Sequence, residues 1–224
     1  MKLIILHGDN FPKSYERLTK FIDVAKERGW GIDRVNDKEK DFKEFVSRTD
    51  LFFKERLLIV EDINLLSESD INYLNKKGDV ISATLIIYSK NTINKTRQKK
   101  FKNVSKIEEF KLPKLIWNFL DSLWPGNAKN SLLLLTEVVK TEPIELVFAL
   151  TARQFRDLFW VRVDPATTQF PPWRAGKLKR QAQKYDEKLL KNIISELAKA
   201  DIEAKTSSAN IKDSLDFLIA SKLE

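Results

Sequence analysis

Hydrophobic positions in the first half of the chain follow two patterns. Runs that are mostly apolar, as in strands buried on both faces of a parallel sheet, occupy residues 2–6, 57–61 and 84–88. After Ser14, a residue suited to cap a helix, apolar side chains recur at helical spacing: Tyr15, Leu18, Phe21, Ile22 and Ala25. This helix is expected to stop near residues 29–31, and a second to cover 38–53. Strands that alternate with helices predict an α/β domain with a parallel sheet.

The pattern after Pro113 is helical throughout. Helices are expected over residues 115–123, 128–140, 144–162, 176–185, 187–200 and 211–223. Asp186 and Asn210 stand where N-caps belong, directly before the last two of these helices. The sequence therefore predicts two domains, an α/β domain over residues 1–112 and an all-α domain over residues 113–224.

Composition excludes several kinds of chemistry. The 224 residues include no cysteine and a single histidine, His7, so thiol nucleophiles, cysteine-ligated metals and two-histidine sites are excluded. No catalytic triad or paired acid is visible, and we expect no metal, no cofactor and no intrinsic catalysis. The net charge of +8 is compatible with an acidic or nucleic-acid partner. Because no membrane-length apolar run or cleavable leader is present, a cytoplasmic protein is expected.

The connection from the first strand to the first helix resembles a phosphate-binding loop that has lost its function. Gly8, Lys13 and Ser14 match parts of the Walker A pattern, but Pro12 replaces the glycine before the lysine. Proline has no backbone N–H with which to hold a phosphate. Acids that follow the second strand, at residues 61–62, resemble a Walker B element. We expect an ordinary strand-to-helix turn without nucleotide, and a P-loop ATPase remains the alternative.

Three segments together resemble one known family. They are residues 6–10 (LHGDN), residues 50–61 (DLFFKERLLIVE) and residues 197–206 (LAKADIEAKT), the last within a stretch that begins at Trp173. They are similar to the delta subunit of bacterial DNA polymerase III, which belongs to the sliding-clamp loader. In that family a glycine usually follows the third segment, and Ser207 stands there in this chain.

The resemblance implies a fold and a function. The fold is a degenerate AAA+, P-loop-like, three-layer domain followed by a helical collar domain, with the family's small lid domain between them missing. The function is that of a clamp-loader delta-like subunit of the replicative polymerase holoenzyme, which is a DNA-directed DNA polymerase. Such a subunit binds and opens the sliding clamp, the beta subunit, and joins other loader subunits through its collar during DNA replication. Primer–template DNA is a further candidate partner.

Leu51 and Phe52 occupy the positions that bind the clamp in the family. At about 100° per residue, a helix over 38–53 turns one apolar face inward and leaves Leu51 on the opposite side, with Phe52 on its flank. The inward face consists of Phe42, Phe45, Val46, Thr49 and Phe53. An exposed Leu-Phe pair suits a partner's hydrophobic pocket. Alternatively, the helix ends before Leu51 and both side chains turn into the core.

A basic run is the second candidate for binding. Residues 90–106 contain seven positive side chains and no acid. The candidate DNA contacts are Lys95, Arg97, Lys99, Lys100 and Lys102. The alternative is a solvated helix face. A simple, non-specific DNA-binding protein is accordingly the third function considered.

Overall fold

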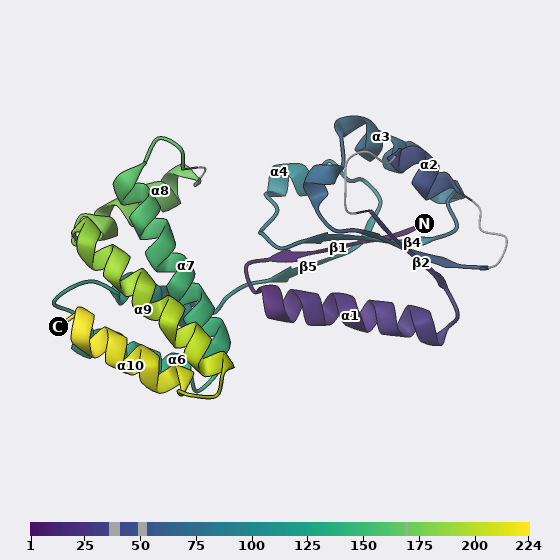
Figure 1. Cartoon of the computed structure of the whole chain (residues 1–224). Helices are drawn as coiled ribbons and strands as arrows, with labels where there is room; N and C mark the ends of the chain where they lie inside the picture. The colour runs from purple at the N-terminus through teal and green to yellow at the C-terminus, as the bar shows by residue number, and fades with distance from the viewer. Residues whose placement is uncertain (36–40, 49–52, 169) are drawn as a thin grey trace. The chain divides into compact units, whose positions relative to one another are not determined.

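A computed structural model describes residues 1–35, 41–48, 53–168 and 170–224. The chain forms two compact units, Met1–Leu112 and Pro113–Glu224. The first is an α/β unit built on a parallel sheet, and the second is made of helices (Figure 1). This confirms the predicted fold class, an α/β domain followed by an all-α domain.

The sheet of the first unit has five parallel strands in the order β2-β3-β4-β1-β5. The strands are β1 (Lys2–Gly8), β2 (Gly31–Val35), β3 (Arg56–Val60), β4 (Thr84–Ser89) and β5 (Val104–Phe110). The three apolar runs of the sequence are β1, β3 and β4, the inner strands of the sheet. These strands are mostly apolar because helices cover both of their faces.

Helices lie on both faces of this sheet, so the unit has three layers (Figure 1). On one face lies α1 (Phe11–Glu27), whose Leu18, Ile22 and Ala25 pack against Ile4 and Leu6 of β1. The opposite face is covered by α2 (Phe42–Ser47), α3 (Glu68–Lys77) and α4 (Lys95–Gln98), with two short 3-10 turns, Ile63–Leu65 and Gly78–Val80. The side chains of neighbouring residues along β1 therefore belong to different cores.

The second helix is shorter than the sequence predicts. It ends at Ser47, because the backbone of Arg48 turns to extended dihedral angles (φ −58°, ψ 125°). Phe42 and Val46 are buried as expected, but the side chain of Phe53 is 43 % exposed. Phe53 lies outside the helix and its ring packs against the backbone of Gly31.

The second unit is a bundle of helices. They are α5 (Lys114–Ser122), α6 (Ala128–Val138), α7 (Ile144–Val163), α8 (Pro172–Ala182), α9 (Glu187–Lys205) and α10 (Ile211–Lys222). Asp186 and Asn210 cap α9 and α10 as predicted, accepting hydrogen bonds from the backbone N–H groups of Leu189 (2.6 Å) and Lys212 (2.8 Å). None of the helices among the described residues has the length and apolar character that a membrane crossing requires.

Candidate functional site

The turn between β1 and α1 is short and tightly held. Only Asp9 and Asn10 separate the strand from the helix. Gly8 has a φ of +143°, and a Cβ placed on it would lie 2.0 Å from the carbonyl oxygen of Phe110. That same oxygen accepts a hydrogen bond from the Asn10 N–H at 3.0 Å, and Asp9 Oδ1 accepts one from the Leu112 N–H at 2.7 Å. The end of β5 therefore occupies the space beside the turn.

The start of α1 uses its own polar groups as caps. Asn10, not Ser14, is the N-cap, and its Oδ1 accepts a hydrogen bond from the Lys13 N–H at 3.3 Å. Ser14 lies one turn into the helix, fully buried, with its hydroxyl bonded to the Phe11 carbonyl oxygen at 3.0 Å. Gly8, Lys13 and Ser14 are thus spread over a strand end and a helical turn. They do not form the loop of consecutive free N–H groups that a phosphate needs.

The acids that follow β3 also have structural partners. Glu61 pairs with Arg34 at 2.9 Å, and Asp62 accepts a hydrogen bond from the Asn64 N–H at 2.8 Å. Within the described part of the chain, no three His, Asp or Glu side chains gather in a group that could hold a metal ion. These contacts favour the structural interpretation of the acids over a Mg²⁺ site.

His7 is buried at the end of β1. Its Nδ1 accepts a hydrogen bond from the backbone N–H of Ile93 at 3.3 Å, which ties β1 to the loop after β4. Burial is the main cause that lowers the pKa of His7 below 6.5; the nearby Glu109 carboxylate opposes this, and Lys111 adds to it. The ring is therefore held neutral, as a hydrogen-bond acceptor.

Arg56, the arginine of the second family segment, holds the end of α2. Its guanidinium forms an ion pair with Asp33 of β2 at 2.8 Å. The same group donates hydrogen bonds to the carbonyl oxygen of Phe45, at 3.3 Å, and to that of Arg48. The Arg56 side chain is only 7 % exposed. These contacts satisfy carbonyl groups that a helix end leaves without partners, and they connect the end of α2 to the start of β3.

The two predicted clamp-binding residues come shortly after α2 in the sequence. Leu51 and Phe52 lie outside the described residues, three and four positions after Arg48. What the structure places is the frame around them, namely the end of α2 on one side and Phe53 to Arg56 on the other. Arg56 belongs to the family pattern, but the sequence indicates no role for it, because its partners at residues 33, 45 and 48 are contacts of the folded chain.

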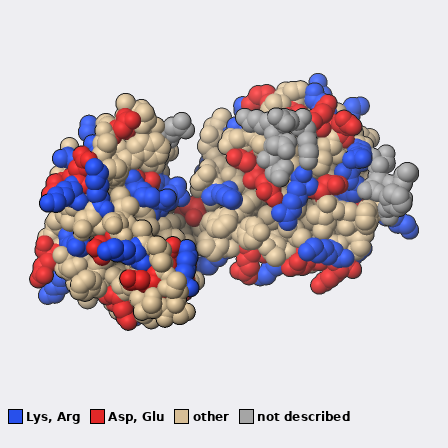
Figure 2. All heavy atoms as spheres, viewed as in Figure 1, with Lys and Arg blue, Asp and Glu red and all other residues tan. Residues whose placement is uncertain are grey.

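The basic run over residues 90–106 does not act as one cluster. Arg97 turns inward, and its Nη2 donates to the carbonyl oxygens of Ile63 (2.8 Å) and Leu66 (3.2 Å). Lys100 pairs with Glu68 at 2.5 Å. Lys95, Lys99 and Lys102 are exposed. Figure 2 shows positive and negative side chains interspersed over the face in view. DNA contact by this run stays a prediction, and Arg97 already has a structural role.

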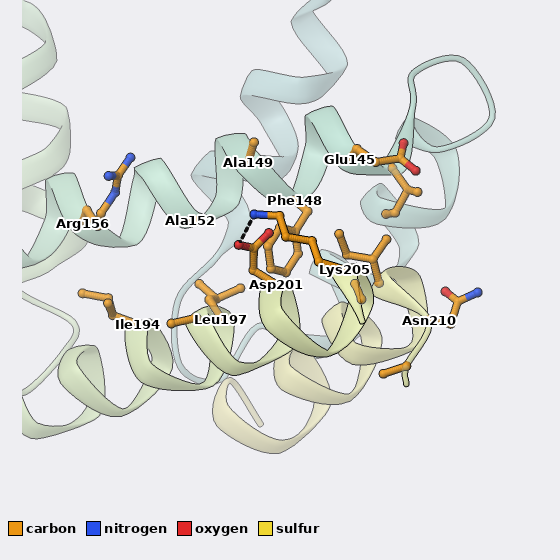
Figure 3. A pocket seen from close by; sticks show the side chains of 15 residues that line it. Glu145, Phe148, Ala149, Ala152, Arg156, Ile194, Leu197, Asp201, Lys205 and Asn210 are labelled. Atoms are coloured by element: carbon orange, nitrogen blue, oxygen red, sulfur yellow. Dashed lines mark hydrogen bonds and ion pairs between the residues drawn. The ribbon is translucent and has the colours of Figure 1, made fainter. Parts of the chain in front are cut away.

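A groove of about 790 Å³ lies between α7 and α9 of the helical unit (Figure 3). Its walls are mostly apolar and include small residues on both helices, such as Ala149, Ala152 and Ala198. Within it, Lys205 pairs with Asp201 at 2.6 Å, near the ring of Phe148. Asp201 and Lys205 both belong to the third family segment. The groove is thus lined in part by residues that carry the resemblance, a role that the sequence did not indicate.

Comparisons with known proteins give weak similarities. No protein-family model matches the chain, and no curated protein matches its sequence. The structure is similar to that of the Bacillus subtilis DNA clamp loader delta protein YqeN, with 14 % sequence identity and a TM-score of 0.45. The match covers 100 % of this chain and 95 % of the YqeN chain.

Two further structures are more distant. A DNA polymerase III gamma subunit-related protein from Thermotoga maritima has 12 % identity and a TM-score of 0.35, over 99 % of this chain and 93 % of its own. A chain of the Drosophila ORC complex with DNA and Cdc6 has 9 % identity and a TM-score of 0.33, over 99 % and 66 %. Because all three TM-scores lie below 0.5, we take the function from the residues of this chain.

Proposed function

We propose that this chain is a clamp-loader delta-like subunit that works by contact and not by nucleotide chemistry. In this proposal Leu51 and Phe52 bind the hydrophobic pocket of a sliding clamp and help to open it. The observation that carries the proposal is the anchoring of the α2 end by Arg56, a residue of the same sequence segment. Arg56 ties the end of α2 to the start of β3, and fixing the chain beside a binding segment reduces the entropy lost when that segment binds.

The state of the β1–α1 turn supports a subunit without its own ATP site. Asn10 pairs with the Lys13 N–H, and the end of β5 pairs with the Asn10 N–H and fills the space beside Gly8, where a phosphate loop would be open.

Ser207 supports the resemblance to the delta family. Its φ of +58° is the left-handed conformation in which glycine is favoured. A left-handed backbone at this position explains why the family usually has glycine there, and this chain has the same backbone conformation with serine.

Assembly with other loader subunits is proposed to use the α7–α9 groove. Small residues on both walls allow another helix to approach closely, and the apolar floor supplies the buried area that stabilises such contacts. Ala149 is exposed on one wall. Ala149→Arg should therefore reduce co-sedimentation with loader subunits, whereas Leu133→Arg, an exposed residue of α6 outside the groove, should not.

The decisive experiment measures clamp affinity by surface plasmon resonance. We expect Leu51→Ala combined with Phe52→Ala to weaken binding by about a thousandfold, since apolar anchors of this kind often contribute about 2 kcal/mol each. The matched control is Phe11→Ala with Val80→Ala, two exposed apolar residues elsewhere on the same unit. Unchanged clamp affinity in the Leu51/Phe52 variant, with unfolding by urea also unchanged, would contradict the proposal.

A further inference from the structure

The helical unit carries a second basic region, centred on α8. Residues 173–185 contain five basic side chains and no acid. Lys177, Arg180 and Lys184 follow one another at intervals of three and four residues, so they lie along one side of the helix and the turn after it. Arg174 is separate, because it pairs with Asp157 of α7 at 2.6 Å.

These three side chains line a hollow of about 170 Å³, the α8 hollow, together with Asp121, Trp124 and Gln181. Its floor is fixed by Gln181, which is buried and donates hydrogen bonds to the carbonyl oxygens of Leu120 (2.9 Å) and Leu123 (2.6 Å). The end of α5 is therefore locked to α8. A hollow with such a floor is formed before any ligand arrives, which lowers the entropic cost of binding.

Most of the positive charge around the α8 hollow is not cancelled. Lys177 forms an ion pair with Asp121. Lys184 Nζ lies 3.3 Å from the ring centroid of Trp124, and this contact holds the ammonium group in place without neutralising it. Arg180 has no acidic partner among the residues that the structure describes. Two uncompensated positive charges and one that is shared therefore face the same hollow.

We propose that the α8 hollow binds phosphate groups of a nucleic-acid strand. Arg180 offers the planar fork of donors that matches two oxygens of one phosphate, and the lysines act as point charges beside it. The side chains of Lys177, Arg180 and Lys184 are exposed and arranged in a row. A row of charges favours a polyanion that passes along the helix over a single small anion, because each phosphate that is neutralised releases a counterion. This site is distinct from residues 90–106 and does not depend on clamp binding.

The test uses the full chain and a fluorescently labelled oligonucleotide, with affinity measured by anisotropy over a series of salt concentrations. Arg180→Glu with Lys184→Glu should lower the affinity at least tenfold. It should also reduce the slope of log affinity against log salt by about 1.5, since each lost phosphate contact removes about 0.7–0.9 from it. The matched control is Lys129→Glu with Lys199→Glu, exposed lysines of α6 and α9 with the same total change of charge.

Three further arms distinguish binding at the α8 hollow from binding elsewhere on the chain and from non-specific attraction of anions. Lys99→Glu with Lys102→Glu reports on the 90–106 run, and should leave more affinity than the α8 variant does. Inorganic phosphate and polyglutamate should displace the oligonucleotide only at far higher concentrations than an unlabelled oligonucleotide does. The proposal is overturned if the α8 variant binds like the control, or if either small phosphate or polyglutamate competes as well as nucleic acid.

Discussion

Asn10 Oδ1 accepts a hydrogen bond from the backbone N–H of Lys13, across the first turn of α1. Lys13 is the residue whose N–H and side chain would serve the nucleotide if this turn were a Walker A loop. In this chain its N–H completes a helix cap instead. Pro12 supplies no N–H at all, and the N–H of Asn10 is bonded to Phe110. The backbone N–H groups of Asn10 and Lys13 in this turn connect β1, α1 and β5 and are not free to bind a phosphate.

The first prediction is that the chain does not bind ATP. With the backbone N–H groups of Asn10 and Lys13 already paired, a bound phosphate would have to break contacts of the helix cap, which contribute about 1 kcal/mol each. Isothermal titration with Mg–ATP should give no saturable heat at millimolar nucleotide. Saturable binding in the micromolar range would favour the P-loop alternative, and it would locate the site at this turn if Asn10→Ala altered it.

The second prediction concerns the end of α9. The N–H of Ser207 donates to the Ala204 carbonyl oxygen (3.2 Å) and that of Ser208 to the Glu203 carbonyl oxygen (2.9 Å), which is the Schellman pattern. Ser207 has a φ of +58°, which costs a residue with a Cβ about 1–2 kcal/mol, partly offset in glycine by its greater freedom when unfolded. Ser207→Gly should therefore stabilise the chain by about 0.5–1 kcal/mol.

Urea unfolding monitored by circular dichroism measures this gain. Ser207→Ala is the control, because alanine keeps the Cβ while removing the hydroxyl. If the glycine variant is no more stable than the alanine variant, the left-handed conformation at residue 207 is not strained as we infer.

The third prediction is a loss of stability in mild acid that depends on His7. Burial holds the pKa of His7 below 6.5, so between pH 6.5 and that lowered value the unfolded chain binds more protons than the folded one. The stabilisation is complete above pH 6.5 and decreases as the pH falls below it. His7→Asn, which retains an acceptor for the Ile93 N–H, should show a smaller decrease between pH 7.5 and 5.5.

His7 is the only histidine of the chain, so its ring resonances need no assignment by mutation. Nuclear magnetic resonance should show them titrating with a midpoint below that of a free imidazole. A midpoint at or above 6.5 would show that the ring is solvated or paired with an acid in the folded state.

The sheet illustrates which strands can be predicted from the sequence. The inner strands β1, β3 and β4 are almost wholly apolar, and the pattern of apolar runs locates them. The same pattern misses the edge strands β2 and β5. Each pairs with a strand on one side only, so part of each is exposed to solvent and carries polar residues. β5 carries Lys106, Glu108 and Glu109 among its apolar residues, and these charges make an edge strand resemble a loop. The polar helix α3 is missed for a similar reason, since only Ile71 and Leu74 are buried in it.

The ends of elements show what the sequence could not supply. Ser14 and Asn10 are both good capping residues, and Asn10 is the cap because the strand continues to Gly8. The spacing of Phe42, Val46 and Phe53 predicts one long helix. The helix α2 nevertheless ends at Ser47, and Arg56 donates hydrogen bonds to carbonyl oxygens at this end. Contacts between residues distant in sequence decide such boundaries. The spacing of apolar residues along the chain carries no information about these contacts.

The last prediction tests whether Arg56 positions the segment that we propose for clamp binding. Arg56→Met keeps the length of the side chain but removes every donor. It leaves Asp33 and the carbonyl oxygens of Phe45 and Arg48 without this partner. Hydrogen bonds to a charged group contribute about 1.5–3 kcal/mol, and Asp33 is 42 % exposed, so we expect a loss of stability of about 2 kcal/mol.

The effect on function should exceed that on folding. At a temperature where urea titration shows the variant folded, Arg56→Met should still weaken clamp binding about tenfold, because residues 49–52 lose the frame on their N-terminal side. Arg34→Met is the matched control, since Arg34 lies on β2 and pairs with Glu61 away from this segment. Arg56→Lys should recover part of the stability but little of the affinity, because lysine lacks the fork that reaches both carbonyl groups and Asp33 together. Equal clamp affinities for Arg56→Met, Arg34→Met and the wild type would remove Arg56 from the binding mechanism and leave it a purely structural residue.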